Sequence, residues 1–211
     1  YSWSEEDGPS IDARSADRVE VIRGPASLQY GSDALGGVVN AIPEDLPRTD
    51  PGQSLTNVGY EAYFASNNKE LGAAVRAEGA RGELGWRLFG IGRHSEALST
   101  PDGELENTGF TAVNGEAAIG LHGERHSGVL RVARYGGEFK LLEANGPPPG
   151  TVEGEEGGPV RKNNDIRAQL AGNHFLGSWW FETRAQFQTH NLEEVSDEAT
   201  AAPAPAGRRL A

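Results

Sequence analysis

Seven consecutive segments of alternating apolar and polar residues constrain the fold of this chain more than any other feature. In the clearest of them, Trp179, Phe181 and Phe187 fall on one side of an extended backbone, and Glu182 and Arg184 fall on the other. This period of two is typical of a β-strand with two different faces. We therefore expect strands near residues 57–65, 70–79, 83–93, 109–122, 128–139, 163–175 and 178–191, and no helix longer than a single turn.

The connections between these segments alternate in length. Those at 80–82 and 176–177 are short and contain glycine, whereas those at 94–108 and 140–162 are long. Outer-membrane β-barrels have this asymmetry, because their turns on the periplasmic side are tight and their outer loops are long. A secreted or surface β-sandwich used for adhesion is the alternative, since strand alternation alone fits both architectures.

Aromatic and charged residues extend the barrel hypothesis. Trp86, Phe175, Trp179 and Trp180 lie beside the short turns, where an interfacial aromatic girdle is expected. Arg131 and Arg134 have opposite parity in one segment, so one of the two must face lipid unless a bulge intervenes near Gly136-Gly137. We expect either that bulge or an Arg134 side chain that snorkels to the membrane surface.

The composition is compatible with a barrel and disfavours nucleic acid as a partner. No run of 18 apolar residues is present, so we expect no transmembrane helix. The mean hydropathy of −0.54 suits barrel strands, because the side of each strand that faces the lumen is polar. A net charge of −12 argues against a nucleic-acid partner, which requires a basic face. The chain has no cysteine, which decides little between compartments.

A glycine-rich run at 17–43 precedes the alternating segments. Val19 to Ile22 is β-branched and predicts a short strand, which Gly24-Pro25 would end. Gly36-Gly37 would let the backbone pass close to a neighbour before Val38 begins a second strand. A glycine-rich loop of a soluble α+β domain is one alternative. A phosphate-binding loop is disfavoured, because no Lys-Ser or Lys-Thr pair follows the glycines.

The same run resembles the end of the plug domain of TonB-dependent outer-membrane receptors. The resemblance depends on fifteen positions at fixed offsets, which are Glu20, Val21, Arg23, Gly24, Pro25, Ser27, Tyr30, Gly31, Ala34, Gly36, Gly37, Val38, Val39, Asn40 and Ile42. We assign a structural role in the plug to Glu20, Arg23, Gly24, Pro25, Tyr30, Gly31, Gly36, Gly37 and Asn40. The resemblance further implies that plug charges such as Glu20 and Arg23 pair with lumen-facing residues of the barrel. The candidate partners are Arg76, Glu78, Arg87, Glu116, Arg167, Glu182 and Arg184.

The resemblance implies an all-β membrane barrel fragment preceded by the end of an α+β plug domain. Residues 1–47 would be the C-terminal part of the plug, and residues 48–211 the first seven or so antiparallel strands of a larger barrel, which in this family has 22 strands. The N-terminal signal, the box that binds TonB and the early plug would then lie outside this sequence.

The function implied by the resemblance is energy-coupled import across the outer membrane of a Gram-negative cell. The expected partners are the TonB complex of the inner membrane, outer-membrane lipid and a scarce nutrient, by family frequency a ferric siderophore or other metal chelate. Haem, cobalamin, zinc and a glycan stay open as substrates, and a passive porin without a plug stays open as a function. Candidate ligand contacts lie at the expected plug apex and are Tyr1, Trp3, Glu5, Glu6 and Asp7.

No enzyme, metal or cofactor site is predicted. The five histidines, at 94, 122, 126, 174 and 190, form no HExxH motif or other close ligand spacing, so we expect them to be surface residues. A GxSxG nucleophile motif is also missing. The acids Glu153, Glu155 and Glu156 could recruit a cation, although a solvated acidic loop is the commoner outcome.

Overall fold

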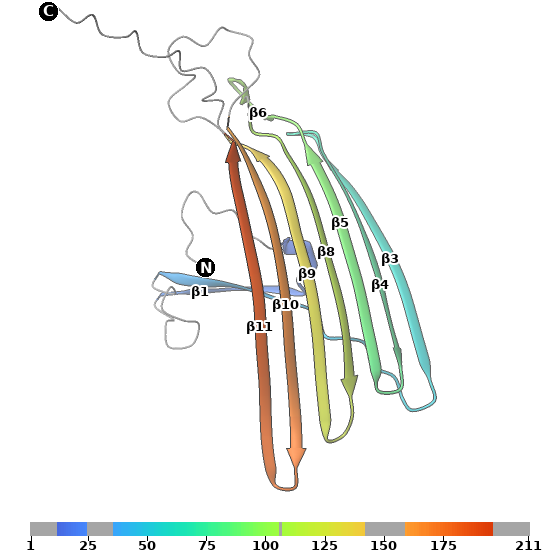
Figure 1. Cartoon of the computed structure of the whole chain (residues 1–211). Helices are drawn as coiled ribbons and strands as arrows, with labels where there is room; N and C mark the ends of the chain where they lie inside the picture. Colours follow the sequence, from blue (N-terminus) through green and yellow to red (C-terminus); the bar gives the residue numbers. More distant parts are fainter. Residues whose placement is uncertain (1–11, 25–35, 106, 142–158, 196–211) are drawn as a thin grey trace, which may run out of the picture.

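A single sheet of seven antiparallel strands dominates the computed structural model, which describes residues 12–24, 36–105, 107–141 and 159–195. Each strand pairs with the strand before it along the main sheet, so the order is β11-β10-β9-β8-β5-β4-β3. All seven expected strands are confirmed and each differs from the expected limits by a few residues at its ends (Figure 1). They are β3 (Ser54–Ala65), β4 (Glu70–Arg81), β5 (Leu84–Ser95), β8 (Phe110–His122), β9 (His126–Lys140), β10 (Val160–Leu176) and β11 (Trp179–Val195).

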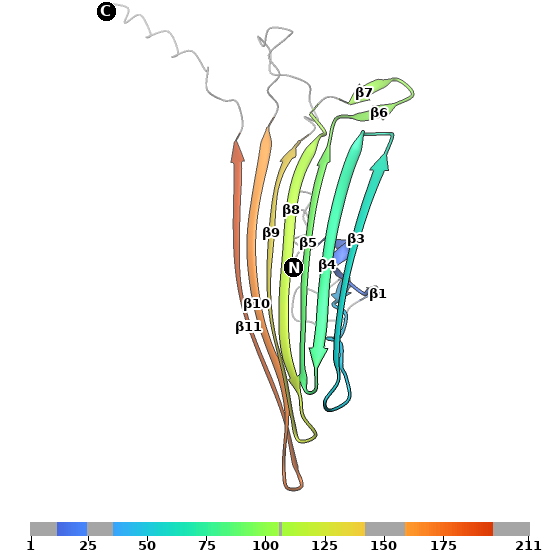
Figure 2. The same cartoon turned by 90° about the vertical axis from the view of Figure 1, so that its right-hand side faces the viewer.

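The described connections have the predicted asymmetry. Figures 1 and 2 show the tight turns between β4 and β5, β8 and β9, and β10 and β11 at one end of the sheet, here called the turn end. The longer connection between β5 and β8 lies at the other end, here called the loop end, and it contains a small hairpin of β6 (Leu98–Thr100) and β7 (Gly103–Leu105). This hairpin was not predicted from the sequence, because strands of three residues are too short to show a period of two.

The glycine-rich run forms a second, separate hairpin. β1 (Arg18–Arg23) pairs with β2 (Gly37–Ile42), and a single 3-10 turn, η1 (Ala13–Ser15), precedes them. Gly24 ends β1 with φ of +98°, which favours glycine. A Cβ atom on Gly37 would lie 2.7 Å from the carbonyl oxygen of Ile22, so the predicted close approach is confirmed there. The hairpin lies crosswise on one side of the main sheet (Figure 1).

The two faces of the main sheet differ in chemistry. We call the face toward the β1–β2 hairpin the inner face; it carries charged and amide side chains from alternate positions, including Glu61, Arg76, Arg87, Asn114 and Arg131. The opposite, outer face is apolar and exposed, with Val58 at 72% and Phe187 at 63% of full exposure. One sheet with an exposed apolar face is what a membrane wall requires, whereas a sandwich would bury that face against a second sheet.

The apolar belt on the outer face runs diagonally across the strands. One line of paired residues crosses the sheet through Tyr60, Val75, Gly90, Gly115, Arg134, Ile166 and Thr189. On β3 this line lies near the middle of the belt. On β11 the outer apolar residues end at Phe187. Measured from this line, the midpoint of the belt therefore lies about seven residues closer to the turn end on β11 than on β3. Seven residues span about 23 Å, and six strand spacings span about 29 Å, so the strands tilt by about 40° from the normal to the belt. Closed barrels have strand tilts of this size.

Arg134 faces outward without a bulge. The pairing of β9 with β8 and with β10 is unbroken through Gly136-Gly137, so the bulge that we considered is excluded. The Arg134 Nε donates a hydrogen bond to Asn164 Oδ1 at 3.1 Å, and Asn164 pairs with Gly136, one step closer to the loop end. The guanidinium is thus directed toward the end of the belt, as the snorkelling alternative predicts.

The aromatic residues beside the turns divide between the two faces. Trp86 and Trp179 have the parity of the outer apolar residues, as an interfacial girdle requires. Phe175 and Trp180 are cross-strand partners on the inner parity, so the expectation that all four belong to the girdle is corrected. The reason is that Trp179 and Trp180 are consecutive in a strand and cannot share a face.

No helix among the described residues is long and apolar enough to cross a membrane.

Candidate functional site

Arg87 binds the segment that connects the hairpin to the sheet, which we call the hinge (residues 43–53). Its Nη1 donates to the carbonyl oxygen of Glu44 at 2.7 Å, and its Nη2 donates to that of Asp45 at 2.8 Å. The same guanidinium binds Glu78 on β4 through Nε and Nη2, at 2.9 and 2.8 Å. Arg87 is 5% exposed, so its charge is compensated by Glu78 and its donors are satisfied largely by hinge carbonyls.

Two further arginines converge on the hinge at Glu44. Arg131 Nη2 donates to the Glu44 carbonyl oxygen at 2.8 Å, while Arg76 Nη1 binds the Glu44 carboxylate at 2.6 Å. Arg131 also binds Glu116 at 3.2 Å. Arg76, Arg87 and Arg131 come from β4, β5 and β9 but all have inner parity, so a single hinge residue ties three strands together.

Leu46 secures the hinge by packing. It is buried, and a Cβ atom on Gly120 would lie 2.9 Å from its Cδ1 atom. A Cβ atom on Gly85 would lie 3.2 Å from the Leu46 Cβ and 2.6 Å from the Pro47 carbonyl oxygen. These two glycines therefore leave a notch in the inner face that any larger residue would fill.

Asp12 provides a separate attachment point between η1 and the sheet. Its Oδ2 accepts hydrogen bonds from Arg93 Nη1 on β5 and Asn114 Nδ2 on β8, both at 3.1 Å. Its Oδ1 accepts from the backbone N–H of Arg14 at 2.9 Å, which fixes the 3-10 turn. Asp12 is 4% exposed, so this contact between η1 and the wall is buried.

Arg14 extends the Asp12 contact toward β3. Its Nη1 forms an ion pair with the Glu61 carboxylate, and its guanidinium lies 3.8 Å from the centre of the Tyr63 ring. The Tyr63 hydroxyl donates to Glu70 at 2.6 Å, and Glu70 also accepts from Arg93 at 3.0 Å. Asp12 and Arg14 thus meet a connected set of inner-face side chains.

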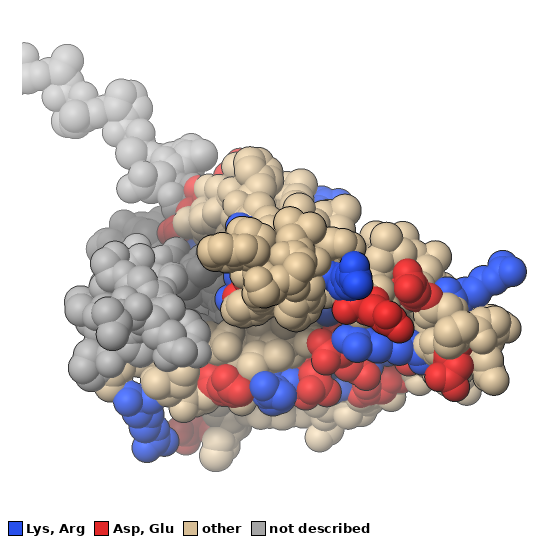
Figure 3. Space-filling view, turned by 90° about the horizontal axis from the view of Figure 1, so that it is seen from below, with Lys and Arg blue, Asp and Glu red and all other residues tan. Residues whose placement is uncertain are grey.

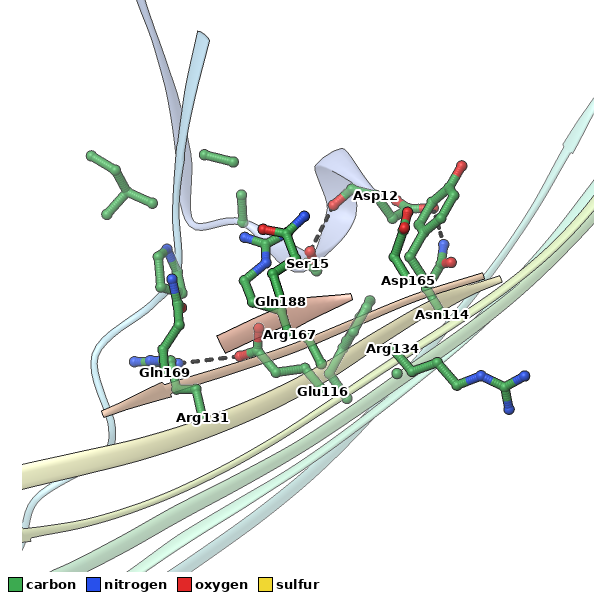
Figure 4. A pocket seen from close by; sticks show the side chains of 18 of the residues that line it. Asp12, Ser15, Asn114, Glu116, Arg131, Arg134, Asp165, Arg167, Gln169 and Gln188 are labelled. Atoms are coloured by element: carbon green, nitrogen blue, oxygen red, sulfur yellow. Dashed lines mark hydrogen bonds and ion pairs between the residues drawn. The ribbon is translucent and has the colours of Figure 1, made fainter. Parts of the chain in front are cut away.

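A cavity of about 510 Å³ lined by both polar and apolar side chains lies between the hairpin and the sheet (Figure 4). Asp12 and Ser15 border it on the η1 side, while Asn114, Arg131 and Asp165 border it on the wall. Further wall residues on its lining are Glu116, Arg167, Gln169, Gln186 and Gln188. The space is lined by donors and acceptors of both charges, which suits water and a polar solute.

Several buried polar atoms on this cavity lack a described partner. They are Asn114 Oδ1, Asp165 Oδ2 and Arg167 Nε. The other carboxylate oxygen of Asp165 contacts His190, and Asp165 is 4% exposed. Buried polar atoms are usually satisfied by protein or by ordered water, so these three atoms mark where water or a solute would bind.

The predicted site residues have mixed outcomes. Tyr1, Trp3, Glu5, Glu6, Asp7, Pro25, Tyr30 and Gly31 lie outside the described residues, as do the acids of the 153–156 loop. Asn40, on β2, lines the cavity. Arg76, Glu78, Arg87, Glu116 and Arg167 have the predicted inner parity.

The plug charges that meet the wall differ from those expected. Glu20 binds Arg18 on its own strand at 3.0 Å, and neither Glu20 nor Arg23 forms an ion pair with the described part of the sheet. Asp12, Arg14 and Glu44 make those contacts instead. Glu44 directly follows Pro43. In the sequence this proline indicated a hinge, but it did not indicate that Glu44 contacts the wall.

Charged contacts also join two connections at the loop end. Lys69 lies in the turn after β3, and Glu96 directly follows β5. The Lys69 Nζ donates a hydrogen bond to the Glu96 carboxylate. This hydrogen bond raises the pKa of Lys69 and lowers the pKa of Glu96 from their ordinary values. Both side chains are exposed, so the contact contributes little to the stability of the fold. Seen from the turn end, acidic and basic side chains are intermixed across the molecule (Figure 3).

No group of three or more His, Cys, Asp or Glu side chains in the described part of the chain could hold a metal ion.

Comparison with known proteins agrees with this architecture. The model of the TonB-dependent receptor plug domain matches residues 2–38. The chain is also 28% identical over 146 residues to the vitamin B12 transporter BtuB of Photobacterium profundum. That alignment covers 67% of this chain and 23% of the relative, so the chain matches less than a quarter of the relative's length. The match to the plug-domain model and the similarity to BtuB, together with the single antiparallel sheet that has an apolar outer face, support the TonB-dependent receptor family of the Gram-negative outer membrane for this chain.

Proposed function

We propose that the protein containing this chain imports a scarce nutrient through the outer membrane by TonB-coupled movement of its plug. The observation that carries the proposal is the seam between hairpin and wall. At Asp12 the two parts are joined by hydrogen bonds and an ion pair, and beside that contact lies the cavity of about 510 Å³. Such contacts can be exchanged for water at low net cost, so they suit a plug that must release and return.

The proposed roles of the two attachments differ. Glu44 and Leu46 tie the hinge to three strands and a glycine notch, so we assign the hinge a stationary role. Asp12 binds two wall residues and stands directly before a three-residue turn, so we assign it the contact that breaks. On this proposal the boundary between plug and wall lies at residue 47, at the end of the proline-flanked part of the hinge.

For the substrate we propose a metal chelate, with vitamin B12 as the first candidate. The support is the similarity to a vitamin B12 transporter. A ferric siderophore, which the resemblance of the sequence favoured, is the second candidate. We also propose that residues 1–7 contact the substrate and that TonB is the energy-coupling partner.

Growth rescue would test the function and the substrate together. The full gene would be expressed in cells that lack their own vitamin B12 receptor and, separately, in cells that lack ferric siderophore receptors. We expect growth on limiting vitamin B12 in the first strain, and loss of that growth when TonB is deleted. Growth only on ferric siderophores would replace the substrate, while TonB-independent growth would contradict energy-coupled import.

A further inference from the structure

Two histidines that are far apart in the sequence face each other on the outer surface of the sheet. His126 begins β9, and His174 lies near the end of β10. They are direct cross-strand partners, and their Nδ1 atoms are 3.3 Å apart. Their ring centres are 5.5 Å apart, with a tilt of 44° between the rings.

The pair lies at the turn end of the outer face. Its parity is that of Leu130 and Leu170, which belong to the apolar belt. His126 and His174 are two outer-face pairs closer to the turns than these leucines, and the exposed Leu176 lies beyond His174 on β10. His126 is exposed and His174 is half-buried, so both rings are accessible on the outer face near the turn end.

The separation of the nitrogens matches a shared metal ion better than a strong hydrogen bond. Hydrogen bonds from a ring N–H are most often about 2.9–3.0 Å long, and this contact is longer. Two imidazole nitrogens that each lie about 2.0–2.1 Å from one tetrahedral ion are about 3.3 Å apart. We propose that His126 and His174 form a two-histidine site for a borderline divalent transition metal, with Zn²⁺ as the reference ion.

The surrounding backbone holds the two ligands in place. The next outer-face pair toward the belt is Gly128 with Gly172, so no side chain covers the rings from that side. A Cβ atom on Gly172 would approach the His174 ring to 3.3 Å. On the turn side, the Phe175 N–H donates to the Arg125 carbonyl oxygen at 2.8 Å. Ligands on paired strands keep their separation better than ligands on loops.

The ligand set defines the class of ion. Neutral imidazole suits Zn²⁺, Cu²⁺ and Ni²⁺, whereas Mg²⁺ and Ca²⁺ require oxygen ligands. Two protein ligands leave further positions for water, so the site is open and exchangeable. Two of the other described histidines have different partners, since His94 contacts Thr111 and His190 contacts Asp165, and neither contacts a second ring.

The site has a structural consequence for the sheet. β9 and β10 are joined through the long connection at the loop end, so their turn ends are held together only by pairing and side chains. A metal ion bound by both histidines would cross-link the two strands where they are farthest from their covalent connection. Metal binding would then stabilise the folded wall in proportion to the logarithm of metal concentration above the dissociation constant.

Zinc titration of the full-length receptor in detergent tests the proposal. Loss of even an outer-shell partner lowers metal affinity by about 10- to 100-fold, so we expect His126→Ala or His174→Ala to weaken Zn²⁺ binding by at least about tenfold. His94→Ala, which removes an outer-face histidine at the loop end, is the matched control and should leave the affinity unchanged. Equal affinity in the wild type and the double variant would overturn the proposal.

A measurement on the unmodified receptor makes the test independent of variant folding. Diethylpyrocarbonate modifies accessible imidazoles, and peptide mass analysis assigns each modified residue. We expect Zn²⁺ to protect His126 and His174 together while His94 stays reactive, and Mg²⁺ to protect neither. Full reactivity of both histidines at saturating Zn²⁺ would also overturn the proposal.

Discussion

Arg87 shows at the scale of one residue how the wall holds the hinge. Its guanidinium binds Glu78 on the neighbouring strand and two hinge carbonyl oxygens, and it is almost fully buried. Prolines on either side of Glu44-Asp45-Leu46 remove two backbone donors, so the hinge cannot pair as a strand. The planar fork of an arginine supplies several donors in fixed directions, which a lysine could not do.

Replacing Arg87 should therefore loosen the hinge and destabilise the wall. Removing one partner of a buried ion pair costs about 3–5 kcal/mol, because the remaining charge is uncompensated. We expect Arg87→Met to lower the temperature at which the full receptor loses its compact, heat-modifiable gel band. Adding Glu78→Gln should recover part of the loss. Arg81→Met, at an exposed outer-face position, is the control; equal band-loss temperatures for the two single variants would contradict the role of Arg87.

At the scale of the element, the position of the apolar belt along each strand indicates how the strands cross the membrane. Residues on one line of the sheet have different surroundings, because the apolar belt descends from β3 to β11. Val75 lies within the belt on β4, whereas Thr189, on the same line, lies beyond the last apolar residue of the belt on β11. Arg134 lies between these extremes and contacts Asn164 toward the loop end.

The tilt predicts unequal costs for the same substitution along that line. An arginine on the lipid side costs about 2–4 kcal/mol at the bilayer midplane and about 0–1 kcal/mol near the interface. We expect Val75→Arg to fall in the first range and Thr189→Arg in the second, measured by reversible unfolding of the full receptor into lipid vesicles. Similar costs at both sites would mean that the strands stand upright and that the diagonal belt has another cause.

At the scale of the whole molecule, the main sheet is joined to the hairpin side of the described chain at two unequal attachments. The hinge attachment includes ion pairs, carbonyl contacts and the buried Leu46, whereas the η1 attachment centres on Asp12 and Arg14. In the described sheet, β3 and β11 each have one unpaired edge. A membrane tolerates such edges only when other strands pair with them, so we expect this wall to form part of a closed barrel.

Covalent cross-links should distinguish the two attachments in transport. The chain has no cysteine, so cysteine pairs can be introduced without background from this segment. We expect a thiol-specific cross-linker between Asp12→Cys and Asn114→Cys to block nutrient uptake but not binding, with recovery after the link is cleaved. A link between Glu44→Cys and Arg76→Cys should leave uptake intact. Uptake through a fully cross-linked Asp12 site would show that η1 does not move.

The sequence by itself determined the strands, the turn end and the family. Alternation at Trp179 to Phe187 and the glycines at 24, 36 and 37 act through local backbone geometry, which neighbouring residues largely decide. Even so, parity alone left open whether a bulge turns Arg134 inward or whether Arg134 faces lipid, and only the unbroken pairing of β8 with β9 excludes the bulge.

Only the tertiary structure decided which distant residues meet. Asp12 reaches Arg93 and Asn114 from a turn that no sequence pattern connects to them, and His126 meets His174 through the register of two strands. These contacts depend on how the hairpin lies on the sheet and on the pairing of strands separated by a long connection. The placement of the hairpin and the strand pairing are set by the packing of the whole chain. Periodicity and motifs could therefore indicate the family but not these contacts.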